Sequence, residues 1–394
     1  MTDPASGRPA ATATPPIPGE TIATPEPRGL LGRISALRKR HAREESILFF
    51  IGGFAFDAVM VGRIDETPVL IQQGAYLTVT GLLLAAMLYL ERKGWEPPEW
   101  FRRPWKGAEP LLHFMLGTLL NAYILFYVKS GSGLTAVVFL VLISLLLVAN
   151  ELPQFHRLGP VVLVGLYSFA LTSYLAYLLP VLLGHLRPWM FLVASALSFL
   201  PMLLLGRAMG RGSGPEGRRS ALKHVLLPAV AVQALLLALF VFRLVPPVPL
   251  SARSLGVYHK VEREGAEFKL SRLPRPRWSE PWRKDEPVFL GRPGDRVFVF
   301  TRIFAPHNFR DQVRVRWARR DARGRWEQSD AIPLRIVGGR EEGFGGYAYK
   351  QNWSVGDWQV AIETEDGREI GRTRFEIRAD PDTSDDRVFD VLRN

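Results

Sequence analysis

Long, uninterrupted apolar runs dominate residues 46 to 245 of this 394-residue chain. About 20 helical residues cross the roughly 30 Å hydrocarbon core of a membrane, and each run is about that long. The runs occupy residues 46–64, 69–91, 109–128, 133–150, 159–183, 188–206 and 224–245. The pattern predicts a membrane α-helical bundle of about seven transmembrane helices over residues 46–245.

Beyond the last run, the hydrophobic pattern alternates with a period of two, which is typical of half-buried antiparallel strands. Segment 296–304 is apolar on both faces and is expected to be a central strand, and Asp366-Gly367 predicts a hairpin with a tight primed turn. We expect an all-β, immunoglobulin-like sandwich over residues 255–379. The core positions expected from the alternation are Val313, Val315, Trp317, Ile332, Leu334, Ile336, Trp358, Val360, Ile362, Thr373, Phe375 and Ile377.

The remaining segments flank these two domains. Residues 1–29, rich in Pro, Ala and Thr, are expected to be a disordered tail, and residues 30–45 a basic juxtamembrane helix. Residues 246–254 form a Pro-rich linker, and 262–287 are expected to be an ordered meander over the sandwich. Residues 380–394 are expected to be a mobile C-terminal tail.

Basic residues predict the orientation of the spans, because cytoplasmic flanks are enriched in Lys and Arg. Of the 22 basic residues before position 251, one set of alternate flanks holds 17 and the opposite set holds 4. This places the N-terminus in the cytoplasm and, after an odd number of spans, the C-terminal domain outside. Arg outnumbers Lys 41 to 9, which hints at a high-GC bacterial source. The expected location is therefore the bacterial inner (cytoplasmic) membrane.

Four polar side chains interrupt four of the apolar runs. Asp57, Asn121, Ser168 and Gln233 lie roughly 14 to 18 Å from the cytoplasmic ends of their spans, at 1.5 Å per helical residue. They therefore share one level of the bundle. Such a cluster indicates either a proton or substrate site or interhelical hydrogen bonds that hold the bundle together, and the second interpretation is favoured.

The outer domain offers arginines on the polar faces of its strands: Arg314, Arg316, Arg335, Arg372 and Arg374. If these strands share a sheet, they form a basic surface for an anionic glycan, lipid headgroups or an acidic partner. The alternative is a solvated face whose arginines pair with cross-strand carboxylates such as Glu363 and Glu376. This alternative is favoured, because such pairs are common in sheets. Four tryptophans are expected either to line a ligand groove or to pack under the meander: Trp278, Trp282, Trp326 and Trp353.

The closing strands carry a resemblance to a known family. The segment YAYKQNWSVGDWQVAIETEDGREIGRTRFEI resembles the end of the bacterial domain of unknown function 2914 (DUF2914). The matching positions are Gly356-Asp357-Trp358, Val360, Asp366-Gly367-Arg368, Gly371 and Phe375, with Trp317 and Leu334-Arg335-Ile336-Val337-Gly338 upstream. The resemblance covers the last third of the chain and implies a C-terminal domain on a membrane protein. It implies no activity and no catalytic residue.

No motif in the chain indicates catalysis or a cofactor. There is no cysteine, which excludes disulfides and thiolate metal sites, and the seven histidines are scattered. Gly212, Gly214 and Gly217 match the dinucleotide-binding spacing, but no strand precedes them. The net charge of +12 is not clustered as a nucleic-acid groove. We therefore expect no catalytic residue, no metal, no cofactor and no nucleic-acid partner.

The leading functional hypothesis is a non-enzymatic inner-membrane protein that presents its outer domain for binding or assembly at the cell envelope. Its expected partners are the bilayer and an anionic envelope component or protein. The first alternative is a transporter or proton-coupled permease that uses the polar level around Asp57. The second is a membrane enzyme acting on lipid-linked substrates, whose site needs no local motif.

Overall fold

The computed structural model describes residues 66–151, 159–211, 214–265, 267–274, 285–382 and 387–394. The predicted tail 1–29, the basic segment 30–45 and the first predicted span, 46–64, lie outside the described residues. The described helices and strands belong to one compact unit.

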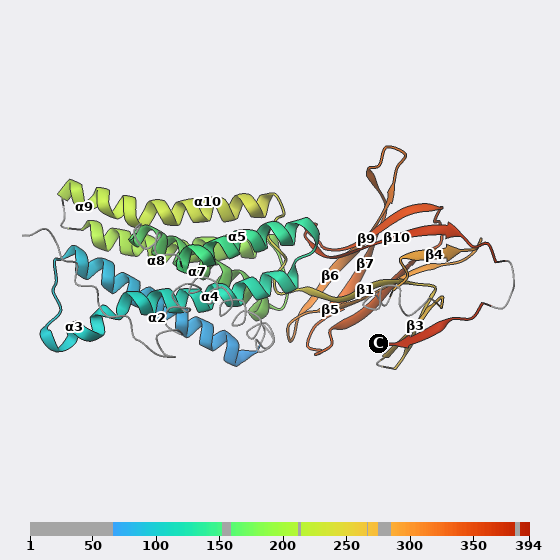
Figure 1. Cartoon of the computed structure of the whole chain (residues 1–394), viewed down its shortest axis with the longest axis horizontal. Helices are drawn as coiled ribbons and strands as arrows, with labels where there is room; N and C mark the ends of the chain where they lie inside the picture. Colours follow the sequence, from blue (N-terminus) through green and yellow to red (C-terminus); the bar gives the residue numbers. More distant parts are fainter. Residues whose placement is uncertain (1–65, 152–158, 212–213, 266, 275–284, 383–386) are drawn as a thin grey trace, which may run out of the picture. The chain divides into compact units, whose positions relative to one another are not determined.

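Six of the predicted spans are helical in the structure (Figure 1). The corresponding long helices are α2 (Thr67–Arg92), α4 (Ala108–Ser130), α5 (Gly133–Glu151), α7 (Pro160–Leu183), α8 (Pro188–Gly210) and α10 (Leu227–Val241). Three shorter helical elements also lie in the described residues: α3 (Glu99–Lys106), α9 (Gly214–Ala221) and the π-helical turn η1 (Leu222–Leu226).

Five helical stretches of the described chain are long and apolar enough to cross a membrane. They are Thr67–Arg92, Glu99–Ser130, Pro160–Leu183, Pro188–Gly210 and Gly214–Val241. Helix α5 is not among these five. It has 19 residues, of which Val137–Leu146 form a shorter apolar helical stretch. The predicted count of seven stays a prediction.

Helix α7 lies at the centre of the bundle, in contact with α2, α4, α5, α8 and α10. Its start and end follow from local sequence, because Pro160 occupies the first turn and Gly184 ends the helix with a left-handed φ of 72°. Pro188 begins α8 directly afterwards. Only residues 184–187 therefore join two long helices, which makes this connection short and sharply defined.

The strands of the described residues form three sheets. The first sheet has the order β1 (Ser251–Tyr258), β5 (Val297–Phe304), β8 (Phe344–Lys350). The second has the order β4 (Val288–Gly291), β10 (Glu369–Ala379), β9 (Gly356–Thr364), β6 (Arg310–Arg320), β7 (Trp326–Val337). The third has the order β11 (Asp390–Arg393), β3 (Glu267–Arg272), β2 (Lys260–Glu264). Among the described strands, all pairings are antiparallel except that of β4 with β10.

One hydrophobic core joins the first two sheets, as the alternating pattern predicts. Of the twelve expected core positions, nine are buried in it, and Ile332 and Leu334 pack against it half-buried. Strand β5, expected to be central, is paired on both sides, with β1 and with β8. Its second apolar face contributes Phe300 to a smaller core that also contains Phe268 of β3.

The segments around the sandwich differ from expectation in three places. Strand β1 begins at Ser251, inside the predicted linker, and the β2–β3 hairpin overlaps the start of the predicted meander, whose residues 275–284 lie outside the described residues. The β9–β10 hairpin is present, but its loop is longer than a two-residue primed turn. The Thr364 amide donates to the Arg368 carbonyl, and Gly367, with φ 83°, donates to the Thr364 carbonyl. This three-residue loop with glycine in the left-handed region is a second common hairpin geometry.

The chain end is an ordered strand, where the sequence predicted a mobile tail. Strand β11 pairs with β3, and the Arg387 guanidinium donates to Asp295 at 2.7 Å and to Asp380. Burial raises the pKa of Asp380, but hydrogen bonds from Arg387, the Asp382 amide and Arg292 outweigh it and lower the value to about 2. This ion-pair group anchors the C-terminal segment at neutral pH.

The α7–α8 connection is part of the β domain as much as of the bundle. Leu186 is buried in the core of the sandwich, and its amide donates to Asp311 Oδ2 at 2.8 Å. Arg187 donates to Asp311 Oδ1 at 2.8 Å, and this hydrogen bond raises the pKa of Arg187. The Gly184 carbonyl accepts from the Arg310 amide at 2.8 Å. We call this set of contacts the Asp311 clamp.

Two further contacts join the helices to the β9–β10 hairpin. Ser132, between α4 and α5, donates to Glu369 Oε1 at 2.7 Å. The Arg368 guanidinium lies 5.3 Å from the ring centroid of Phe240 in α10 and donates to Asp366 at 2.8 Å. The α4–α5 connection, the α7–α8 connection and the exit of α10 therefore meet the β domain at the same end of the bundle.

We predict that Leu186→Ala destabilises the β domain by about 2–5 kcal/mol, the usual range for a buried leucine truncated to alanine. The measurement is the denaturant midpoint of the β domain in the detergent-solubilised full chain, followed by pulse proteolysis. The control is Leu182→Ala, whose side chain in the last turn of α7 is 67% exposed. Equal midpoints for the two variants would show that Leu186 does not stabilise the sandwich.

Candidate functional site

The predicted polar level of the bundle contains a closed hydrogen-bond network around Gln233. The Gln233 Nε2 group donates to Thr172 Oγ1 at 2.8 Å and to Ser198 Oγ at 2.9 Å. Its Oε1 atom accepts from Ser195 Oγ at 2.6 Å. Thr172 also donates to the Ser168 carbonyl at 2.8 Å. All the side chains in the network are buried and uncharged.

The network joins three helices and brings two of the four predicted residues together. Gln233 comes from α10, Thr172 and Ser168 from α7, and the two serines from α8. Ser168 takes part through its carbonyl, while its buried hydroxyl has no partner among the described residues. Asn121 lies on α4, outside these three helices, and Asp57 lies outside the described residues.

This geometry favours interhelical hydrogen bonding over a transport site. Both amide hydrogens of Gln233 have hydroxyl acceptors, and the network contains no group that titrates near neutral pH. The sequence analysis missed Thr172, Ser195 and Ser198. The sequence does carry a signal for them: Thr172 follows Ser168 by four residues and Ser198 follows Ser195 by three, so each pair of polar side chains lies on one face of an apolar helix. The transporter and membrane-enzyme alternatives stay predictions.

The second candidate site is the outer face of the five-stranded sheet, where the structure brings the five predicted arginines together. Strands β6, β7 and β10 all belong to this sheet. Arg316 and Arg372 both lie opposite Ala361, and Arg374 lies opposite Gln359. Arg335 lies opposite Gln312, two positions before Arg314. We call this set of five side chains the arginine face.

The arginine face is only partly neutralised. Arg316 pairs with Glu363 at 2.6 Å, as the cross-strand alternative expects, and Arg372 pairs with Glu369. Glu376 pairs instead with Arg378 of its own strand, at 2.7 Å. Arg314 and Arg335 are exposed, and neither forms an ion pair with another described residue. The face therefore keeps an excess of positive charge.

A pocket of about 340 Å³ opens beside the arginine face. Its lining includes Trp326, Arg374, Arg320 and Asp357. The Arg374 guanidinium lies 5.5 Å from the Trp326 ring centroid and donates to Gln359 at 3.1 Å. Trp326 therefore takes the position expected of a groove residue, combining an aromatic wall with a charged rim.

The other tryptophans of the predicted groove do not join this pocket. Trp353 packs against the sandwich core, and its indole nitrogen donates to the Asp295 carbonyl at 2.8 Å. Trp278 and Trp282 lie outside the described residues.

Hydrogen bonds lower the pKa of two carboxyls of the five-stranded sheet, one on each of its faces. The Arg378 guanidinium donates to Glu376 and lowers the pKa of that carboxyl. The hydrogen bond from Lys350 lowers the pKa of Asp330 in β7. In the described part of the chain, no three His, Asp or Glu side chains gather as metal ligands would.

The comparisons with known proteins bear on the β domain. Residues 310–377, from the start of β6 to near the end of β10, match the family model described as "Protein of unknown function (DUF2914)". The resemblance found in the sequence is thus confirmed for this region. A comparison with curated proteins finds no match.

One solved structure has a long alignment with the chain. It is the Pseudomonas fluorescens alkylpurine DNA glycosylase AlkC bound to DNA containing an abasic site analog. It is 12% identical, the alignment covers 80% of this chain and 98% of that one, and the TM-score is 0.21. A likeness this low carries no argument about fold or function.

We predict that Gln233→Leu destabilises the helical bundle by about 1–2 kcal/mol, because three buried hydroxyls lose a partner. The measurement is the midpoint of SDS-induced unfolding of the bundle in mixed micelles. Leu235→Ala, on the exposed side of the same helix, is the control and should shift the midpoint less. An unchanged midpoint for Gln233→Leu would contradict the stabilising role.

Proposed function

We propose that the protein is a polytopic inner-membrane protein that presents an extracytoplasmic β-sandwich for binding at the bacterial cell envelope. In this proposal the bundle has about seven spans, counting residues 46–64, and the sandwich is immunoglobulin-like. The ligand is an anionic envelope component, and its binding surface is the arginine face.

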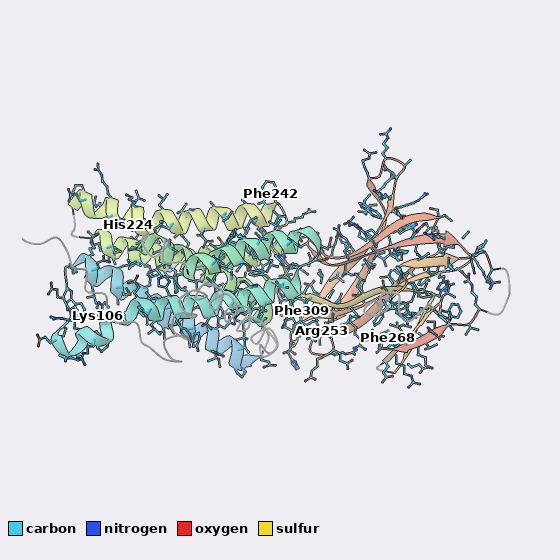
Figure 2. The ribbon with its side chains drawn as sticks, viewed as in Figure 1. Lys106, His224, Phe242, Arg253, Phe268 and Phe309 are labelled. Atoms are coloured by element: carbon cyan, nitrogen blue, oxygen red, sulfur yellow. The ribbon has the colours of Figure 1, made fainter. Side chains whose placement is uncertain are left out.

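The distribution of basic residues supports this orientation. The bundle end farther from Phe242 is labelled by Lys106 and His224 in Figure 2. At this end Arg92 of α2 donates to the Gly217 carbonyl at 3.2 Å. The described basic residues near it are Arg92, Lys93, Arg102, Arg103, Lys106, Arg207, Arg211, Arg218, Arg219 and Lys223. Because cytoplasmic flanks are basic, this end faces the cytoplasm and the β domain lies on the opposite side.

The observation that carries the binding proposal is the alignment of five arginines on one sheet face with incomplete neutralisation. A guanidinium forms bidentate, charge-assisted hydrogen bonds with carboxylates and phosphates. The strands hold these groups at fixed spacings, so less side-chain entropy is lost when a repeating anion binds than on a flexible loop. Such a surface suits an extended anionic polymer.

The experiment measures binding of a soluble anionic polysaccharide to the full chain in nanodiscs of zwitterionic lipid. We expect replacement of Arg314, Arg316, Arg335, Arg372 and Arg374 by glutamine to weaken binding about tenfold or more, a loss of about 1.4 kcal/mol or greater. The wild-type affinity should also fall steeply as salt increases.

The control replaces cations of the third sheet by glutamine: Lys260, Arg263, Lys269 and Arg393. It should leave the affinity within about twofold, since only nonspecific charge attraction is lost. If both variants weaken binding equally, the polysaccharide responds only to the net charge of the protein and the arginine face is not its binding surface. If the folded wild type does not bind the polysaccharide, the proposal is refuted.

A further inference from the structure

Arg302 is a buried cation on the central strand β5, on the sheet face opposite to the one that joins the main core. Its neighbours across the sheet are Ser254 of β1 and Gly345 of β8. The side chain is only 10% exposed. Nη1 donates to Glu342 Oε2 at 2.5 Å, whereas Nε is buried without a partner among the described residues. An unpaired buried donor of this kind is costly and calls for an explanation.

Arg302 lines a pocket of about 340 Å³ that is separate from the arginine face. Phe268 of β3, labelled in Figure 2, lines the same pocket, as do Arg340 and Gly345. A Cβ atom at Gly345 would lie 2.5 Å from the Phe268 ring, so only glycine leaves the ring in this position. The pocket therefore combines a buried guanidinium with an aromatic wall.

The present partner of Arg302 is an exposed carboxylate. The Glu342 side chain is 79% exposed and belongs to the short turn that Gly343 ends with φ 91°. An exposed carboxylate gains little from an ion pair, because it gives up hydration and side-chain freedom. A second carboxylate that brings its own apolar group into the pocket would gain burial against Phe268 in addition.

We propose that this pocket binds a small organic carboxylate whose apolar part lies against Phe268, with Arg302 as the anion-binding group. The free Nε edge of the guanidinium matches the planar, two-oxygen geometry of a carboxylate. Glu342 acts as the internal counter-ion that the ligand displaces. Because Glu341 and Glu342 offset the charges of Arg302 and Arg340 at the pocket, a monoanion fits it better than a phosphate dianion.

The test uses the full chain in detergent, with hexanoate as the probe, hexanol as its neutral counterpart and inorganic phosphate as a second anion. Binding is measured by calorimetry. We expect hexanoate to bind and hexanol and phosphate to bind at least about tenfold more weakly. Glu342→Gln should bind hexanoate more tightly than wild type, since no internal carboxylate competes.

Two variants should lose hexanoate affinity about tenfold: Arg302→Lys, which keeps the charge but loses the planar two-nitrogen edge, and Gly345→Ala, which displaces the Phe268 ring from its place on the pocket wall. Glu264→Gln, which removes the partner of Lys269 on the third sheet, is the control and should bind as wild type. Unfolding midpoints show which variants are folded.

The Glu342→Gln result does not depend on those variants folding. Hexanoate binding that is unchanged or weaker in Glu342→Gln overturns the proposal, as does equal binding to folded Arg302→Lys. Phosphate binding equal to that of hexanoate would identify a general anion site and would also overturn it.

Discussion

The carboxylate of Asp311 connects the two halves of this protein. It accepts the Leu186 amide and the Arg187 guanidinium, both at 2.8 Å, while its own side chain is only 5% exposed. Leu186 is buried among side chains of the sandwich at the same point. A buried carboxylate needs such partners, and a leucine supplied by the helical connection completes the core of the β domain. The sandwich is therefore packed onto the bundle as well as linked to it by the chain after α10.

The contacts between the sandwich and the bundle define two different ends of the bundle. They place the α4–α5 connection, the α7–α8 connection and the exit of α10 at one end, and leave the basic residues near Arg92 and Gly217 at the other. Within the bundle, Gln233 holds α7, α8 and α10 through neutral groups. The two clusters of arginines described above, the arginine face and the pocket around Arg302, both lie in the β domain.

Local patterns were sufficient to predict the long described helices and the buried faces of β6, β7, β9 and β10. Apolar runs predict the helices, and alternation predicts the core positions of β6, β7, β9 and β10, because both signals depend only on neighbouring residues. The arginines of one face were predictable for the same reason, since their spacing of two keeps them on the polar side of a strand.

Features that depend on contacts distant in sequence could not be predicted. Strand β11 forms because Arg387 reaches Asp295, 92 residues away, and because β3 offers an edge for pairing. The partners of Gln233 come from two other helices, and nothing in their sequence specifies which helices pack together. Arg302 stands in an apolar segment, but its burial depends on Phe268 and Gly345, which come from other strands.

The central claim is that the sandwich and the basic end of the bundle lie on opposite sides of the membrane. The chain has no cysteine, so single cysteines can report this directly. Ala322→Cys, exposed in the β6–β7 turn, and Glu216→Cys, exposed near the start of α9, would be treated in intact cells with a membrane-impermeant maleimide. The account predicts that position 322 reacts and that position 216 reacts only after the cells are opened. Labelling of 216 but not 322 in intact cells would contradict it.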